Sequence, residues 1–136
     1  MKKIIKYSSL AAFGGVGYNI IELLWRGYSH ISMTFAGGIS FLILYIINNS
    51  YKKMPLLLKS LLGGAAITVV EFISGVIVNM KMNLAVWNYS DRKFNLLGQI
   101  CLLYSVLWVL LCIPVNLLLD KFRNTWKDLR FMIKYS

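Results

Sequence analysis

The sequence predicts an all-α integral membrane protein: a bundle of four transmembrane helices, followed by a basic amphipathic helix. Three observations predict this class. Hydrophobic residues make up 58% of the 136 residues and charged residues only 15%, against about 25% charged residues in an average soluble domain. The apolar residues form four blocks, each close to the roughly 20 residues that cross a bilayer. The net charge of +10 lies mostly between and after these blocks, which favours contact with anionic lipid over nucleic acid.

The predicted transmembrane domain covers residues 1–120, and a tail covers residues 121–136. Each apolar block is expected to be a helix, because lipid offers the backbone no other hydrogen-bond partners. The first block contains Asn19 and Glu22 and no small-residue cleavage site follows it, so we interpret it as a retained span and not as a signal peptide. The four spans are expected at residues 4–24, 31–47, 56–78 and 96–119.

The distribution of basic residues predicts the orientation in a cell membrane. With the N-terminus inside, 11 of the 15 Lys and Arg residues face the cytoplasm and 4 face outward. This bias predicts a multi-pass protein with both termini cytoplasmic. In the tail, apolar residues recur at helical spacing beside basic ones, which is typical of a helix lying on the inner membrane surface. The alternative is a fourth span that continues into solvent. The apolar residues are Phe122, Trp126, Leu129 and Ile133.

An internal repeat is the next prediction. A glycine pair followed by a glutamate occurs twice at an offset of 49 residues, as Gly14–Gly15 with Glu22 and Gly63–Gly64 with Glu71. At an offset of 61 residues, Gly37 falls on Gly98. We therefore expect two parallel helical hairpins, related by an axis along the membrane normal.

Two glutamates inside the predicted spans indicate a polar site in the outer half of the membrane. A carboxylate within a span is costly, so Glu22 and Glu71 are expected to face the bundle interior. Helical spacing places Asn19 and Arg26 beside Glu22, and Thr68 beside Glu71. A purely structural pair, neutralised by Arg26 or Arg92 or held protonated, is the alternative. The outer loops are expected to cap the site through His30, Trp87, Asn88, Tyr89, Ser90, Asp91, Arg92 and Gln99.

No catalytic residue, metal ligand set or cofactor is assigned from the sequence. Cys101 and Cys112 lie 11 residues apart, or about 16 Å along a helix, which exceeds the reach of a disulfide. No phosphate-binding Gly-Lys-Ser or Gly-Lys-Thr loop occurs, so no ATPase is expected within this chain.

Four segments resemble motifs of one bacterial membrane family, described as "Putative ABC-transporter type IV" (CmpB-like). They are Leu24–His30, Glu71–Gly75, Trp87–Ser90 and Phe94–Leu102. The resemblance implies a multi-pass membrane protein with a role in transport, and it covers the chain from about Gly14 to Leu118. One departure is Asn88, where the family usually has Asp; an Asn caps a turn equally well.

The function that we predict is therefore that of a small transporter or permease-like protein. Four helices enclose little space, so a homo-oligomer or a partner membrane subunit is expected. A non-catalytic scaffold or holin-like pore former is one alternative. A membrane-embedded lipid-modifying enzyme is another, and it requires Glu22, Glu71, His30 and Asp91 to converge within hydrogen-bond reach.

Overall fold

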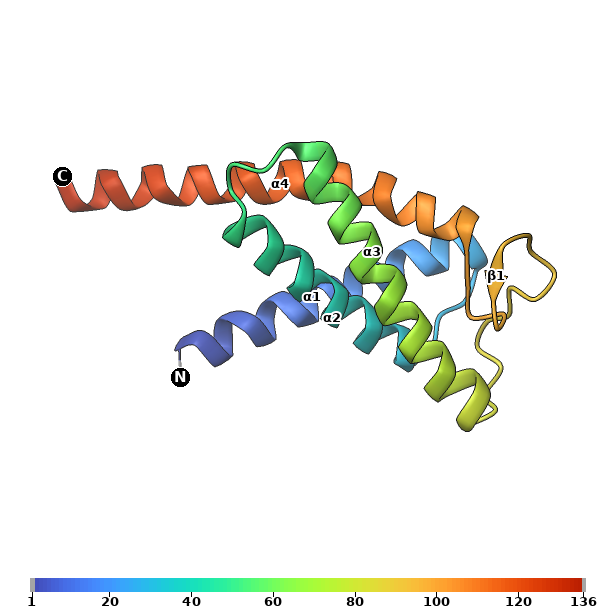
Figure 1. Ribbon diagram of the computed structural model, residues 1–136. Coiled ribbons are helices and arrows are strands. Elements are labelled where there is room, and N and C mark those ends of the chain that lie inside the picture. Colours follow the sequence, from blue (N-terminus) through green and yellow to red (C-terminus); the bar gives the residue numbers. More distant parts are fainter. Residues whose placement is uncertain (1, 136) are drawn as a thin grey trace.

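The computed structural model describes residues 2–135, which are mostly helical (Figure 1). The all-α class is thus confirmed, although the outer limits of the predicted domains, Met1 and Ser136, lie outside the described residues. Two strands of two residues each form an antiparallel hairpin before the last helix. The elements are α1 (Lys2–Arg26), α2 (Ile31–Ser50), α3 (Leu56–Gly75), the π-helix η1 (Val76–Lys81), β1 (Asn95–Leu96), β2 (Ile100–Cys101) and α4 (Leu102–Tyr135).

Three helical stretches of the described chain are long and apolar enough to cross a membrane: Ile31–Ser50, Leu56–Lys81 and Leu102–Tyr135. Helix α1 has 25 residues, but it carries basic residues at both ends and a glutamate within. Many large apolar side chains are exposed on the outward faces of the helices, which is typical of a surface that lipid covers. The chain is therefore a membrane protein.

The helices pack as two hairpins, because α1 packs mainly on α2, and α4 mainly on α3. Glycines allow the close approach in each hairpin. A Cβ atom on Gly15 would lie 2.6 Å from the carbonyl oxygen of Thr34, and one on Gly64 would lie 2.3 Å from the side chain of Val109. Both chain ends lie on one side of the bundle (Figure 1). We call this side the terminal end, and the opposite side, where residues 82–101 fold, the loop end.

Residues 96–101 do not begin the fourth helix as predicted. Leu97 and Gly98 form the turn of the β1–β2 hairpin, with φ of +54° and +72°, and this left-handed backbone cannot continue an α-helix. Gly37, in contrast, is buried within α2. The predicted pairing of Gly37 with Gly98 is therefore wrong, since one residue is helical and the other lies in a turn.

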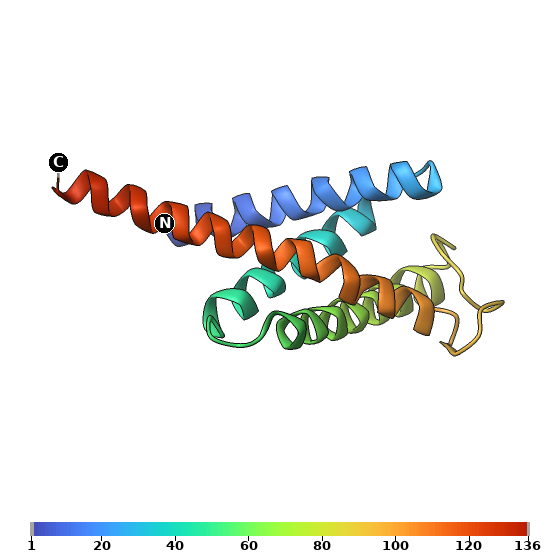
Figure 2. The ribbon, with the colours of Figure 1, turned by 90° about the horizontal axis from the view of Figure 1, so that it is seen from above.

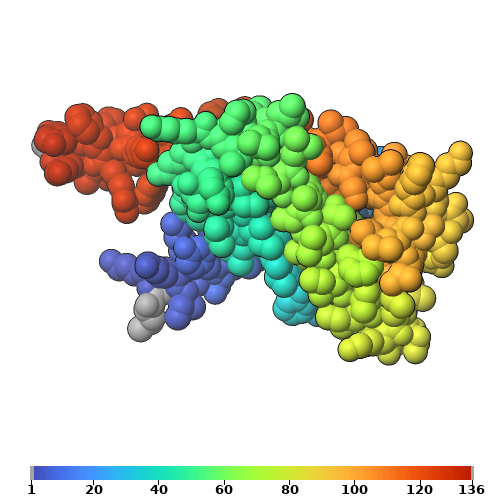
Figure 3. All heavy atoms as spheres, in the orientation of Figure 1, coloured from blue at the N-terminus to red at the C-terminus, as the bar shows by residue number. Residues whose placement is uncertain are grey.

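Helix α4 is the longest element, with 34 residues. Its length of about 51 Å exceeds the roughly 30 Å of bilayer hydrocarbon. Residues 121–135 continue the same helix without a break, and they project beyond the packed bundle (Figures 2 and 3). The structure thus shows the continued fourth helix and no separate element at residue 121.

Candidate functional site

A polar cluster at the loop end joins the two predicted glutamates. Glu22 and Glu71 are only 4% and 9% exposed. The Arg26 Nε atom lies 3.2 Å from Glu22 Oε2, and Arg26 Nη2 donates a hydrogen bond of 2.8 Å to the Tyr89 hydroxyl. That hydroxyl in turn donates to Glu71 Oε1 at 2.9 Å. Arg26 and Tyr89 therefore connect the carboxylate of α1 to the carboxylate of α3. We call these four residues the glutamate cluster.

Aromatic side chains enclose the glutamate cluster. The indole Nε1 of Trp108 in α4 donates a hydrogen bond of 2.7 Å to Glu71 Oε2, so both oxygens of this carboxylate have donors. The ring of Tyr104 stacks on Tyr89 at 4.8 Å between centroids, and the ring of Tyr18 lies 5.8 Å from that of Trp108. These rings exclude water from the carboxylates and strengthen the electrostatic interactions between them and Arg26.

The glutamate cluster contains two carboxylates and one guanidinium group, so it carries one net negative charge when both glutamates are ionised. Glu22 Oε2 accepts no hydrogen bond from any described residue, because the nearby Arg26 nitrogen approaches it outside hydrogen-bond geometry. Among the described residues, Arg92 forms no ion pair with either glutamate; it is exposed and lies 5.6 Å from the centre of the Tyr104 ring. A buried charge without a full set of partners is costly.

Tyr89 acts as a neutral hydrogen-bond donor in this cluster. Burial raises the pKa of its phenol above the ordinary value, and the adjacent Glu71 carboxylate raises that pKa further. The hydroxyl therefore stays protonated throughout the physiological pH range, and it donates a hydrogen bond to Glu71.

The loop between η1 and β1 is folded onto the end of α3 and carries Tyr89 inward. The side-chain oxygen of Asn79 accepts the backbone N–H of Val86 at 2.7 Å, and its amide nitrogen donates to the Gln99 side chain at 2.8 Å. Trp87 Nε1 donates to the Gln99 carbonyl oxygen at 3.0 Å. A Cβ atom on Gly75 would lie 2.5 Å from the Gln99 side-chain oxygen and 3.1 Å from the Trp87 ring, so the packing here leaves little room for a side chain on residue 75. The loop of residues 82–94 thus packs over the glutamate cluster, and we call it the loop cover.

Asn88 stabilises a turn in this cover. Its side-chain oxygen accepts the backbone N–H of Ser90 at 2.9 Å and also accepts from the Ser90 hydroxyl. A carboxylate oxygen at this position would accept the same hydrogen bonds, so Asn in place of the family's Asp preserves the turn. Asp91 is exposed on the outer surface of the loop.

Three predicted site residues form hydrogen bonds with residues outside the glutamate cluster. His30 caps the N-terminus of α2, where its ring nitrogen accepts the backbone N–H two residues on. Asn19 donates to Thr34 of α2 at 2.7 Å, and Thr68 donates to Ser105 of α4 at 3.1 Å. The structure therefore does not bring His30 and Asp91 together with the two glutamates as the acid/base set of an enzyme.

A second polar cluster, which the sequence did not predict, lies at the terminal end. Lys59 and Arg123 both form ion pairs with Asp120, at 3.4 and 2.9 Å. Asn48, 1% exposed, donates to Asn116 at 3.0 Å. Two cations and one carboxylate leave one net positive charge here. We call this set the terminal cluster; it consists of Asn48, Lys59, Ser60, Asn116, Asp120 and Arg123.

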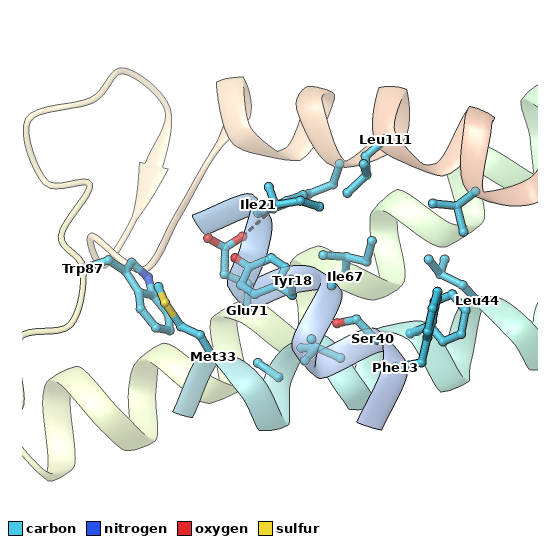
Figure 4. Close-up of a pocket in the computed structure, with 18 of the residues that line it drawn as sticks. Phe13, Tyr18, Ile21, Met33, Ser40, Leu44, Ile67, Glu71, Trp87 and Leu111 are labelled. Carbon is cyan, nitrogen blue, oxygen red and sulfur yellow. Dashed lines mark hydrogen bonds between the residues drawn. The ribbon is translucent and has the colours of Figure 1, made fainter. Parts of the chain in front are cut away.

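A cavity of about 220 Å³ extends from the glutamate cluster into the bundle. All four α-helices line it, together with Trp87 and Tyr89 of the loop. Figure 4 shows Trp87 and Met33 at one end, Phe13 and Leu44 at the other, and the Glu71 carboxylate between them. Arg26 and Glu71 are the charged residues that line it, so a polar region at the loop end leads into an apolar interior.

Comparison with known proteins gave one family. The match to the family described as "Putative ABC-transporter type IV" extends over residues 9–134. No curated protein sequence and no solved structure matches the chain. The family match covers the cavity, the glutamate cluster, the loop cover and nearly all of α4, and it agrees with the three helices that are apolar enough to cross a membrane. This transporter-like membrane protein therefore belongs to the "Putative ABC-transporter type IV" family.

Proposed function

We propose that the protein is a small multi-pass transporter whose glutamate cluster binds a proton and a cation in turn. The observation that carries this proposal is the charge of the cluster. Two buried carboxylates share one guanidinium group, and Glu22 Oε2 accepts no hydrogen bond from the described residues. Because an unneutralised charge inside a membrane is expensive, a proton or a cation is the occupant that the cluster favours.

In this proposal α1 is the fourth span, and both termini face the cytoplasm. The basic residues near the terminal end support that orientation, and those of residues 121–135 would lie close to anionic lipid. The glutamate cluster and its loop cover then lie in the outer half of the membrane. Since four helices enclose a small volume, we propose that the active form is a homo-oligomer or includes a partner membrane subunit.

We also propose that the two hairpins descend from one duplicated unit. In addition to the glycine pairs and the glutamates, one contact is repeated: a polar residue three positions before each glutamate bonds a hydroxyl of the second helix. These contacts are Asn19 to Thr34 and Thr68 to Ser105. Thr34 and Ser105 are 71 residues apart, as are the first residues of α2 and α4, so the second helices correspond at this offset and not at 61.

Flux measurements on protein reconstituted in liposomes test the transport proposal. A pH-sensitive dye inside the liposomes reports proton movement when Na⁺, K⁺ or tetramethylammonium is added outside. We expect cation-dependent proton movement for the wild type and a loss of about tenfold or more for Glu22→Gln and Glu71→Gln, because each change removes a carboxylate charge. Asp91→Asn, which alters an exposed carboxylate at the same end, is the control and should retain the wild-type rate. Wild-type flux in both glutamate variants would contradict the proposal.

A further inference from the structure

We infer that the cavity below the glutamate cluster binds an organic monocation with an apolar body, such as a hydrophobic amine or a quaternary ammonium compound. This inference rests on the proposed function, because it names the class of cation that the cluster would carry. The charge, the lining and the aromatic content of the cavity each support it.

The charge of the polar region selects a cation. Glu71 lines the cavity, and its two oxygens are held by Tyr89 and Trp108. Arg26 also lines it, but this guanidinium group is already bound to Glu22 and Tyr89. One negative charge remains in the cluster when both glutamates are ionised, so an anionic headgroup would be repelled and a single positive charge attracted.

The lining of the cavity selects an apolar body. Ser40 is the one aliphatic hydroxyl among the lining residues, and the carboxylate of Glu71 is the one carboxylate among them. An inorganic cation such as Ca²⁺ or Mg²⁺ requires six or more oxygen ligands, which this lining does not supply. The lining instead offers aliphatic and aromatic side chains that an apolar group can contact, namely Phe13, Phe41, Leu44, Ile67, Leu111 and Val115.

Aromatic rings gather at the charged end of the cavity. Tyr18, Trp87, Tyr89 and Trp108 all line it, and Tyr18 lies next to the Glu71 carboxylate in Figure 4. The faces of Trp and Tyr attract organic cations, and quaternary ammonium groups are bound in this way by aromatic cages. A carboxylate combined with such rings accommodates a bulky cation that cannot form hydrogen bonds.

Calorimetric binding to the full chain in lipid nanodiscs, with empty nanodiscs as the blank, tests this inference. Three probes separate charge from body: benzyltrimethylammonium, tetramethylammonium, which has the same head without the ring, and benzenesulfonate, which has a ring with the opposite charge. We expect benzyltrimethylammonium to bind about tenfold more tightly than tetramethylammonium, because the ring enters the apolar interior. Benzenesulfonate should not bind.

Gly17 offers a variant that fills the cavity and leaves the glutamate cluster intact. This residue lines the cavity, and a Cβ atom added to it meets no other atom within 4 Å. Gly17→Leu should weaken the binding of benzyltrimethylammonium by about tenfold and change that of tetramethylammonium by less than about twofold. The matched control is Ala12→Leu, which introduces the same side chain at an exposed position of α1. This variant should bind both probes as the wild type does. Glu71→Gln should lose both.

The outcomes distinguish this inference from the proposed function. If both ammonium probes bind equally and Glu71→Gln abolishes both, the apolar-body inference is overturned while the cation site stands. If Gly17→Leu binds benzyltrimethylammonium as the wild type does, the ring does not enter the cavity, and the inference is again overturned. If Glu71→Gln binds both probes like the wild type, the proposed function fails as well. Binding of benzenesulfonate more tightly than benzyltrimethylammonium would overturn the choice of charge.

Discussion

Tyr89 is the residue that connects the loop cover to the membrane-embedded charges. Its hydroxyl accepts from Arg26 and donates to Glu71, so a single oxygen atom links side chains from different hairpins. The ring is 5% exposed and stacks on Tyr104. A tyrosine here therefore combines an apolar body, which tolerates burial, with a polar tip that completes the hydrogen bonds of the glutamate cluster.

Tyr89→Phe removes only this oxygen and tests its role. We expect the free energy of unfolding to fall by about 1–3 kcal/mol, because Glu71 Oε1 and Arg26 each lose a hydrogen-bond partner in a buried site. Thermal unfolding of the purified protein in detergent measures the effect. Tyr28→Phe is the matched control, since Tyr28 is 54% exposed, and it should unfold as the wild type does. An unchanged unfolding temperature for Tyr89→Phe would show that the bridge contributes nothing to stability.

The importance of individual polar residues was only partly predictable from the sequence. Glu22 and Glu71 were predicted to face the interior because a carboxylate within an apolar helix has few alternatives. Asn48 and Asn116 were not, because their hydrogen bond joins residues 68 positions apart, and no local spacing reveals such a pair. Asn79, which holds the loop through Val86 and Gln99, was missed for the same reason.

At the scale of elements, close backbone contact defines each hairpin. Gly15 of α1 faces the carbonyl oxygen and the methyl group of Thr34, so the two helices meet here with no room for a side chain on α1. Gly17, only two residues further along α1, faces open space. These two glycines belong to the same helix but have different roles: one permits packing, while the other leaves the cavity empty.

Substitution of these two glycines by alanine separates the roles. Gly15→Ala should lower the free energy of unfolding by about 1–3 kcal/mol, because the added methyl group forces α1 away from the backbone of α2. Gly17→Ala should be neutral or should raise that free energy by up to about 1 kcal/mol, through the higher helix propensity of alanine. Thermal unfolding of the two variants side by side is the measurement. Equal effects would mean that the hairpin does not depend on close approach at Gly15.

The elements themselves were largely predictable, and the exception has a local cause. Long apolar blocks correctly indicated α2, α3 and α4, because an isolated apolar segment in lipid satisfies its backbone hydrogen bonds only as a helix. Residues 96–101 are as apolar as a span, but Leu97 and Gly98 adopt positive φ angles that end the regular structure. The hydrogen bonds of Asn95 with Arg92 and Gly98 hold this turn. Composition alone does not reveal a turn that side chains from within the loop stabilise.

At the scale of the whole molecule, the two buried polar clusters carry opposite charges when their carboxylates are ionised. The glutamate cluster at the loop end has one excess carboxylate, and the terminal cluster has one excess cation. In the terminal cluster, Lys59 is 3% exposed and its ion pair with Asp120 ties α3 to α4. The excess of cations in the terminal cluster agrees with the proposed orientation, in which basic residues remain on the cytoplasmic side.

Cysteine labelling of intact cells tests this orientation. Lys53→Cys places a thiol in the turn between α2 and α3, and Lys93→Cys places one in the loop before β1, at the opposite end. Both positions are exposed, whereas the native Cys101 and Cys112 are buried. A membrane-impermeant maleimide should label Lys93→Cys in intact cells and should label Lys53→Cys only after permeabilisation. The reverse pattern would place the glutamate cluster in the inner half of the membrane.

Helix α4 connects the glutamate cluster inside the bundle with an end that projects beyond it. Trp108 donates a hydrogen bond to Glu71 inside the bundle, and the same helix, with Pro114 in its interior, ends at Tyr135, well outside the bundle. If α4 tilted by about 10° about Cys112, its far end, about 35 Å away, would move by about 6 Å. In a tilt of the whole helix, a displacement at the cavity too small to separate the helices is therefore magnified at the projecting end, whereas a bend at Pro114 would move that end and leave Trp108 in place.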